Sequence, residues 1–84
     1  MSFFPEFNCC LGGVIRANRK RMAISQMVLA ERAGVTRRFI QELENGRSSV
    51  SLQTLFALSR ALETNLTEIC AQIESAIQNI RNEK

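Results

Sequence analysis

The stretch SQMVLAERAGVTRRFIQELENGR, residues 25–47, constrains the fold more than any other part of the chain. It contains two segments of helical length, residues 26–33 and 37–45, separated by only three residues that begin with Gly34. A connection this short requires the two helices to meet at a steep angle, and glycine tolerates the positive φ that such a corner needs. The sequence therefore predicts a helix-turn-helix unit over residues 25–45.

Three further amphipathic segments flank this pair, and no convincing strand is present. Turn-forming residues at Ala23, Asn45-Gly46 and 63–65 separate the segments. The expected helices cover residues 8–22, 26–33, 37–45, 52–62 and 66–81, with Ser25, Thr36 and Ser51 as N-caps. With 84 residues, the chain is expected to be one all-α domain of five helices, residues 1–84.

The spacing of apolar residues predicts which helical faces form the core. In residues 8–22 the apolar face includes Leu11, Val14 and Ile15, at intervals of three and four residues. In residues 37–45 it comprises Ile40 and Leu43. In the segment 52–62 the residues expected to face inward are Leu52, Leu55, Phe56, Ser59 and Leu62.

Glu44 falls on the inward face of its helix, where an isolated carboxylate would be costly. Arg19 shares a helical face with Leu11 and Ile15, so it can reach the same region of the core. We therefore expect a partly buried Arg19–Glu44 ion pair with a structural role.

The outward face of residues 37–45 is polar. It carries Arg38, Gln41 and Glu42, with Arg37 at the edge in the first turn. Arginine matches the O6 and N7 acceptors of guanine, and a glutamate can accept from a cytosine amino group. Arg37, Arg38, Gln41 and Glu42 are therefore the candidates for reading DNA bases. The alternatives are an ordinary solvated face and an i+4 pair between Arg38 and Glu42.

Three further polar residues are placed to contact DNA phosphates without reading sequence. Gln26 opens a helix whose free N–H groups favour an anion. Asn45 ends the segment 37–45 and Arg47 follows it, so both would lie on the other side of the major groove of DNA from Gln26.

The basic charge is concentrated in one part of the chain. Residues 16–47 hold eight basic and three acidic residues, a net charge of +5, which leaves −2 for the rest of a chain whose total is +3. Such asymmetry favours a polyanionic partner such as double-stranded DNA, although a solvated surface is an equally simple explanation.

The composition argues against several other classes of function. The chain has no histidine, and Cys9, Cys10 and Cys70 form no Cys-x-x-Cys motif, so no metal is expected. Neither paired carboxylates nor a glycine-rich phosphate loop suggests an enzyme, a cofactor or a small-molecule ligand. Unpaired cysteines, the lack of a long apolar run and an N-terminus without a basic leader favour a cytoplasmic protein.

The last helix, residues 66–81, carries an apolar stripe that extends beyond what a small domain needs. We expect Ile73, Ile77 and Ile80 to form the interface of a homodimer. Packing of this helix against Phe3, Phe4 and Phe7 is the first alternative. A protein partner that covers the stripe, as an antitoxin binds its toxin, is the second.

Several short motifs, taken together, resemble the lambda-repressor-like, or Xre-type, helix-turn-helix regulators. They are Ser25-Gln26, Leu29-Ala30, Ala33-Gly34-Val35, Leu43-Glu44-Asn45-Gly46, Ser51-Leu52 and Leu55. The resemblance covers about three quarters of the chain. It implies a five-helix domain that binds operator DNA as a symmetric dimer, with an Arg19–Glu44 pair. It also implies base contacts by Arg37, Arg38 and Glu42 and phosphate contacts by Gln26, Asn45 and Arg47.

Three residues depart from the family pattern. Ala23 stands where a glycine usually ends the first helix, Asn18 where an apolar residue is common, and the bulky Phe39 could pack inward or touch a thymine methyl. The small single domain is also similar to restriction-modification controller proteins, and regulators of phages and plasmids and antitoxin components have similar lengths.

Overall fold

The computed structural model describes residues 4–82, which form five helices and no strand, as the all-α prediction requires. The helices are α1 (Phe7–Arg21), α2 (Gln26–Ala33), α3 (Arg37–Glu44), α4 (Leu52–Ala61) and α5 (Leu66–Asn82). Each predicted helix is present, with ends within one residue of those expected. Over these residues, no helix combines the length and apolar content that a membrane crossing requires.

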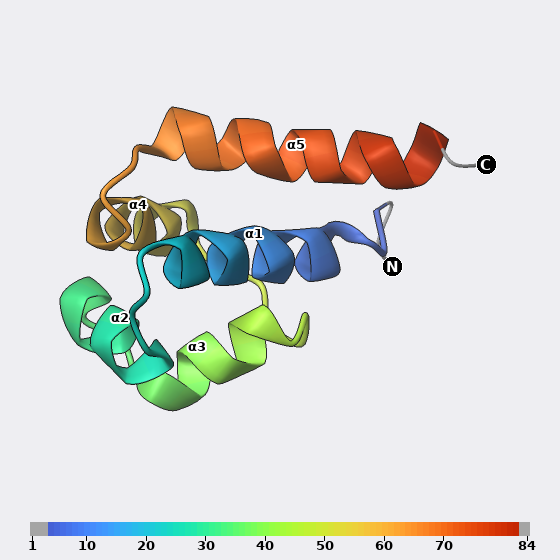
Figure 1. The fold of residues 1–84 in the computed structure, drawn as a ribbon. Coiled ribbons are helices and arrows are strands. Elements are labelled where there is room, and N and C mark those ends of the chain that lie inside the picture. Colours follow the sequence, from blue (N-terminus) through green and yellow to red (C-terminus); the bar gives the residue numbers. More distant parts are fainter. Residues whose placement is uncertain (1–3, 83–84) are drawn as a thin grey trace.

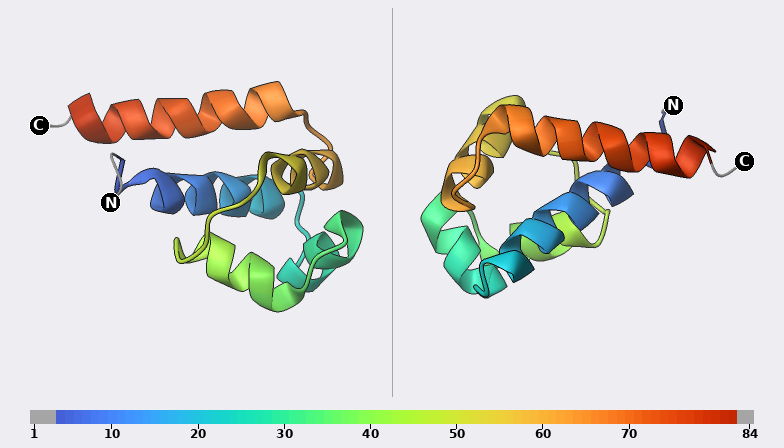
Figure 2. Two further views of the ribbon diagram at one scale, coloured as in Figure 1. Left: turned by 180° about the vertical axis from the view of Figure 1, so that it is seen from behind. Right: turned by 45° about the horizontal axis from the view of Figure 1, so that its top comes forward.

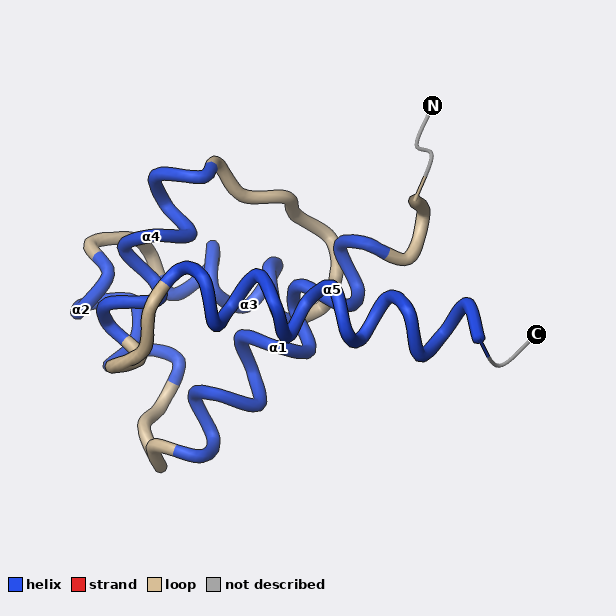
Figure 3. Tube along the Cα trace, turned by 90° about the horizontal axis from the view of Figure 1, so that it is seen from above, coloured by secondary structure: helices blue, strands red, loops and turns tan. Residues whose placement is uncertain are grey.

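The helices lie in three layers (Figure 1). α5 packs against α1 and α4 from one side, and the α2–α3 pair lies on the other side, where α3 packs against α1 and α2 packs against α4 (Figures 1 and 2). Figure 3 shows α5 running across the face of the other helices, with its last turns extending beyond them towards the first described residues. The central α1 therefore connects the α2–α3 pair to α5.

Local signals in the sequence fix where the helices begin. The side-chain oxygens of Ser25, Thr36 and Ser51 each accept a hydrogen bond from the backbone N–H three residues later, at 3.0–3.1 Å. These are the predicted N-caps, and each satisfies one backbone donor that the helix itself leaves free.

The corners after α1, α2, α3 and α4 contain the four residues with positive φ among those described. They are Ala23 (57°), Gly34 (74°), Gly46 (75°) and Glu63 (57°). Glycine adopts this conformation at little cost, whereas Ala23 does so with the steric strain expected from its departure from the family pattern.

The core lies where α1 meets the other helices. Its fully buried apolar residues are Leu11, Ile15, Leu29, Ile40, Leu43, Leu58, Leu62 and Ile69. Phe39, for which the sequence left two orientations open, is half-buried and packs against this core. The predicted inward faces of α1 and α3 are confirmed.

The predicted inward face of α4 is wrong in part. Leu55 and Leu62 are buried, but Leu52 is 67% exposed and Phe56 is 51% exposed. The fully buried Leu58 lies instead on the inward face. Since α4 packs against both α2 and α5, its buried face is rotated away from Leu52 and Phe56, which remain at the surface.

The role of Ile73 also differs from the prediction. Ile73 is only 4% exposed because it packs into the core of its own chain, so the expectation that it contacts a second copy is wrong. Ile77 is half-buried and Ile80 is 38% exposed. These two residues remain predictions for an interface.

The N-terminal segment packs against the end of α5, as the alternative reading proposed. The Arg81 guanidinium carbon lies 4.6 Å from the centre of the Phe4 ring, and Arg81 Nε lies 3.0 Å from Glu6 Oε2. Phe3, also named in that alternative, lies outside the described residues. An apolar groove of about 580 Å³ nevertheless runs beside these contacts, with Phe4, Phe7, Leu52 and Ile77 in its lining.

Asn18, the second departure from the family pattern, is buried and joins α1 to α5. Its Nδ2 donates to Val14 O and to Gln72 Oε1, both at 2.8 Å, and its Oδ1 accepts from Arg21. The amide is therefore satisfied on both sides, which explains how a polar residue is tolerated at this position.

Gly12 allows α1 and α3 to approach each other at backbone distance. A Cβ at this position would lie 2.3 Å from Leu43 O and 3.0 Å from Glu44 O. The neighbouring Gly13 faces open space. Only the first of these two adjacent glycines is thus required by packing.

We expect opposite effects from alanine at the two positions. Gly12→Ala should lower the free energy of unfolding by about 1–3 kcal/mol, because a methyl group would push the α3 carbonyls away. Gly13→Ala should raise it by roughly 0.5–1 kcal/mol, because an exposed helical glycine is replaced without a clash. Urea unfolding of the two variants measures both values, and equal effects would contradict this account of the α1–α3 contact.

Candidate nucleic-acid interface

The orientation of α3 separates a buried face from an exposed polar face. Ile40, Leu43 and Glu44 are buried, whereas Arg37, Arg38 and Gln41 are exposed. The exposed side chains point to the side of α3 away from α1. The sequence therefore placed the two faces of this helix correctly.

Six of the predicted DNA-contacting residues line one shallow concavity of about 520 Å³. They are Arg37, Arg38, Gln41, Glu42, Asn45 and Arg47. Every residue in its lining has a polar side chain, and together they supply three guanidinium groups, two amides and one carboxylate. Its chemistry suits hydrogen bonding to an anionic, polar partner rather than binding of an apolar ligand.

Glu42 pairs with a different arginine from the one considered in the sequence. Arg47 Nη1 lies 3.8 Å from Glu42 Oε2, and the backbone N–H of Arg47 donates to Glu42 O at 3.0 Å. Arg38 forms no ion pair with a described residue. Because the Arg47 side chain is 72% exposed, the Glu42–Arg47 pair is weak and leaves both groups accessible.

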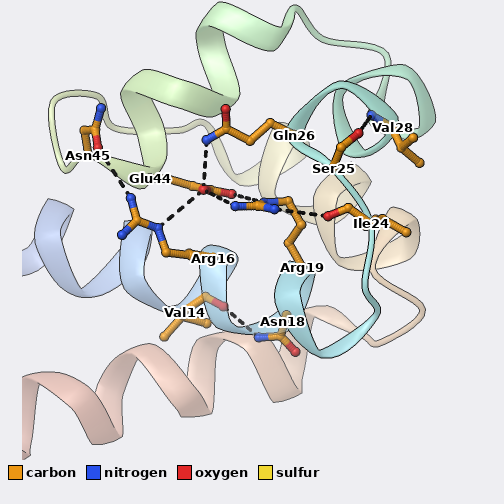
Figure 4. Close-up of polar contacts among 10 residues, drawn as sticks. All are labelled: Val14, Arg16, Asn18, Arg19, Ile24, Ser25, Gln26, Val28, Glu44 and Asn45. Carbon is orange, nitrogen blue, oxygen red and sulfur yellow. Dashed lines mark hydrogen bonds and ion pairs between the residues drawn. The ribbon is translucent and has the colours of Figure 1, made fainter.

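The predicted Arg19–Glu44 pair is present on the opposite side of α3 (Figure 4). Arg19 Nε donates to Glu44 Oε2 at 2.7 Å and Nη2 donates to Oε1 at 2.9 Å, a bidentate arrangement. Arg19 Nη1 also donates to Ile24 O at 3.0 Å, in the turn between α1 and α2. The Glu44 side chain is fully buried, and Arg19 is 12% exposed.

Gln26 lies away from the concavity and holds the same carboxylate. Its Nε2 donates to Glu44 Oε1 at 3.1 Å, so α2 as well as α1 is connected to α3 through Glu44. A phosphate contact by Gln26 remains a prediction. Because its side-chain amide is bonded to Glu44, the backbone N–H of Gln26 at the start of α2 is the group best placed to bind a phosphate.

The environment of Glu44 lowers its pKa. Burial by itself raises the pKa, but hydrogen bonds from Arg19 and Gln26 and the charges of Arg19 and Arg16 outweigh it. Since the folded-state pKa lies below the unfolded one, the charged pair stabilises the fold above the ordinary glutamate pKa. This contribution is lost as pH falls through the folded-state value.

Two residues that organise the site were missed in the sequence. Arg16 was counted only among the basic residues, yet its Nε lies 3.5 Å from Glu44 Oε1. For Gly12, the sequence indicates a low helix propensity but no packing role. Arg16 lies one helical turn before Arg19, and this spacing was the signal in the sequence that could have predicted the contact of Arg16 with Glu44.

The described residues contain no cluster of histidine, cysteine or acidic side chains that could hold a metal ion. Cys10 is buried, and burial raises the pKa of its thiol. Cys9 and Cys70 are exposed. None of the three cysteines lines the polar concavity beside α3.

A family model for helix-turn-helix proteins, HTH_3, matches residues 15–69, more than half of the chain. The chain therefore belongs to this family of DNA-binding transcription regulators, whose function is binding rather than catalysis. The matched range covers residues 15–21 of α1, the helix-turn-helix unit, α4 and the start of α5.

Individual relatives agree with this assignment. An uncharacterized HTH-type transcriptional regulator of Methanothermobacter thermautotrophicus is 49% identical over 49 residues, which cover 58% of this chain and 71% of that protein. The immunity repressor protein of Bacillus phage phi105 is 33% identical over 79 residues, or 88% of this chain, which spans 55% of the repressor's length.

Among solved structures, the restriction-modification controller protein C.AhdI from Aeromonas hydrophila has a similar fold. It superimposes with a TM-score of 0.76 and 26% identity, over 81% of this chain and 99% of the controller. Nearly the whole length of that controller protein therefore shares the lambda-repressor-like fold of this chain.

We expect Arg19→Met to destabilise the fold by about 3–5 kcal/mol at neutral pH, because it leaves the fully buried Glu44 carboxylate without its main partner. The loss should shrink as pH falls, because burial raises the pKa of a Glu44 that has lost Arg19, and the carboxyl of the variant then becomes neutral at a higher pH than in the unmodified chain. Denaturant unfolding at a series of pH values measures this.

Arg32→Met is the matched control, since the Arg32–Glu63 pair is exposed and its charged atoms are 3.9 Å apart. Its cost should stay below about 1 kcal/mol and change little with pH. A similar small cost for Arg19→Met would show that Glu44 does not depend on this ion pair.

Proposed function

We propose that this chain is a sequence-specific regulator of transcription that binds a palindromic DNA operator as a homodimer. The observation that carries the proposal is the gathering of six polar side chains on the exposed face of α3 and the turn after it, with the opposite face fixed by Glu44. In this arrangement α3 lies in the major groove.

The base-reading residues are Arg37, Arg38, Gln41 and Glu42. The arginines would donate in pairs to guanine O6 and N7, Gln41 can both donate and accept, and Glu42 can accept from a cytosine amino group. Their positions in the first two turns of α3 support this assignment, since Arg37, Arg38 and Gln41 are exposed and Glu42 is partly exposed.

The phosphate-contacting residues of the proposal are Gln26, Asn45 and Arg47. Asn45 and Arg47 follow α3, whereas Gln26 opens α2 and reaches Glu44 at the end of α3. Phosphate contacts from these two elements would fix the angle of α3 in the groove without reading sequence.

The homodimer would form through the apolar side of the molecule. Ile80 is 38% exposed, and Ile77 lines the apolar groove together with the exposed Phe4, Phe7 and Leu52. Six large apolar residues are exposed in the described part of the chain, and five of them lie on α4, on α5, or before and at the start of α1, whereas Met27 lies on α2. A concentration of this kind indicates an interface.

A twofold dimer places the two α3 helices about one DNA turn apart, roughly 34 Å, on two half-sites of opposite orientation. The biological setting we favour is a restriction-modification controller or a phage or plasmid repressor, given the similarity to C.AhdI and the phi105 repressor. Neighbouring genes for a methyltransferase and endonuclease would identify the first.

The same apolar surface supports a second candidate function, an antitoxin-like module that binds a partner protein through α5. The exposed Leu52 and Phe56 favour it as much as they favour a dimer. A stoichiometric second polypeptide in the purified complex would identify this function, and a clean homodimer would argue against it.

The recognition surface can be tested by selecting bound duplexes from a randomised DNA library. Arg37→Ala and Arg38→Ala are each expected to relax preference at particular base pairs and to weaken operator binding by about 1–3 kcal/mol. Arg47→Ala is the control, because loss of a phosphate contact should weaken all sequences alike. Unchanged sequence preference in both recognition variants would refute the assignment of α3.

The dimer surface can be tested by sedimentation at micromolar concentration. Ile80→Glu and Leu52→Glu should each weaken self-association roughly a hundredfold or more, because both would bury an unpaired charge at the interface. Met27→Glu, at a 55% exposed position on α2, is the matched control and should leave the dimer intact. Persistent dimers in both test variants would place the interface elsewhere.

A further inference from the structure

Arg16 connects the buried centre of the domain to the edge of the proposed DNA surface. It lies on α1, one turn before Arg19, and its side chain is 44% exposed. Its Nε lies 3.5 Å from Glu44 Oε1, and its Nη2 donates to Asn45 Oδ1 at 3.5 Å. Figure 4 shows the guanidinium between the two residues, which are adjacent at the end of α3.

This contact decides how the Asn45 amide is oriented. A guanidinium group has donors and no acceptor, so only the amide oxygen of Asn45 can face Arg16. The Nδ2 group must then point the other way, as Figure 4 shows. Asn45 thus presents a donor on the surface that it shares with Arg47.

The position of Arg16 is itself fixed by the buried carboxylate. Glu44 is held by Arg19 at 2.7 Å and by Gln26 at 3.1 Å, and it attracts Arg16 from the same side as α1. A free asparagine amide could rotate and present its oxygen, which would repel a phosphate. Arg16 makes that orientation unfavourable.

We propose that Arg16 is a positioning residue for DNA binding: it fixes the Asn45 amide so that Nδ2 donates to a backbone phosphate. The inference rests on the proposed function, because it assigns Asn45 to the phosphate contact. Arg16 acts through Asn45 and does not contact the DNA itself.

A double-mutant cycle tests this with a 20-base-pair duplex of mixed sequence, since phosphate contacts do not depend on base identity. Asn45→Ala should weaken binding about tenfold, the value of one hydrogen bond to a charged group. Arg16→Met should weaken it severalfold. The double variant should bind no worse than Asn45→Ala, because Arg16 then has no amide to position.

The dependence of affinity on salt distinguishes positioning from direct contact. If Arg16 neutralised a phosphate, Arg16→Met would reduce the slope of log K against log salt by about 0.9. Positioning predicts the same slope as for Lys20→Met, the control, which removes an exposed charge from the same helix.

Arg16→Lys keeps a charge beside Glu44 and is a second variant should Arg16→Met be poorly folded. Arg16→Lys should also weaken DNA binding in the otherwise unmodified chain, and it should cause no further loss of affinity in the Asn45→Ala background.

Independent, multiplying effects of the two substitutions, or a slope reduced by about 0.9, would overturn the role of Arg16 while leaving the proposed function intact. Failure of the unmodified chain to bind any duplex at low salt would overturn both.

Discussion

The buried carboxylate of Glu44 is the interaction on which the geometry of this domain depends. Arg19 and Arg16 approach it from α1 and Gln26 approaches it from α2, so one side chain on α3 connects three helices. Arg19 also holds the carbonyl of Ile24 in the intervening turn. Rotation of α3 about its axis would break all of these contacts at once, and this fixes which face of the helix is exposed.

The same contacts contribute less to stability than their number suggests. Removing two charges from water is costly, and a buried ion pair often does no better than apolar residues of similar volume. Its advantage over an apolar cluster is directional, since a bidentate pair has one geometry whereas leucines can repack in several. We infer that the network is a device for orientation. Gly12 complements it, because the backbone contact with α3 prevents the helices from separating or sliding.

Much of the fold could be predicted because it depends on local signals. The N-cap residues, the glycine at 34 and the spacing of apolar residues act within one or two turns, and all gave the correct helices. The Arg19–Glu44 pair was predictable for a different reason, since a charge on an apolar face requires a partner.

Other features depend on how the helices are placed in three dimensions, which periodicity does not specify. Gly12 has a packing role only because α3 crosses α1 at that residue, and Asn18 is tolerated only because Gln72 on α5 faces it. Ile73 and Leu52 share the apolar character of their neighbours, yet one is buried and the other exposed. The sequence shows that a face is apolar but not where the neighbouring helix ends.

The pairing of the arginines changes systematically from the core to the surface of α3. Arg19 is fully paired, Arg16 shares a carboxylate and an amide at longer distances, and Arg37 forms no ion pair with any described residue. An arginine that is already paired must exchange a carboxylate for a phosphate or a base, whereas an unpaired one gives up only water. A surface that binds DNA should therefore leave the arginines of its exposed helical face unpaired, and Arg37 and Arg38 form no ion pair with a described residue. Arg47, which follows the helix, differs in keeping a weak, exposed pair with Glu42.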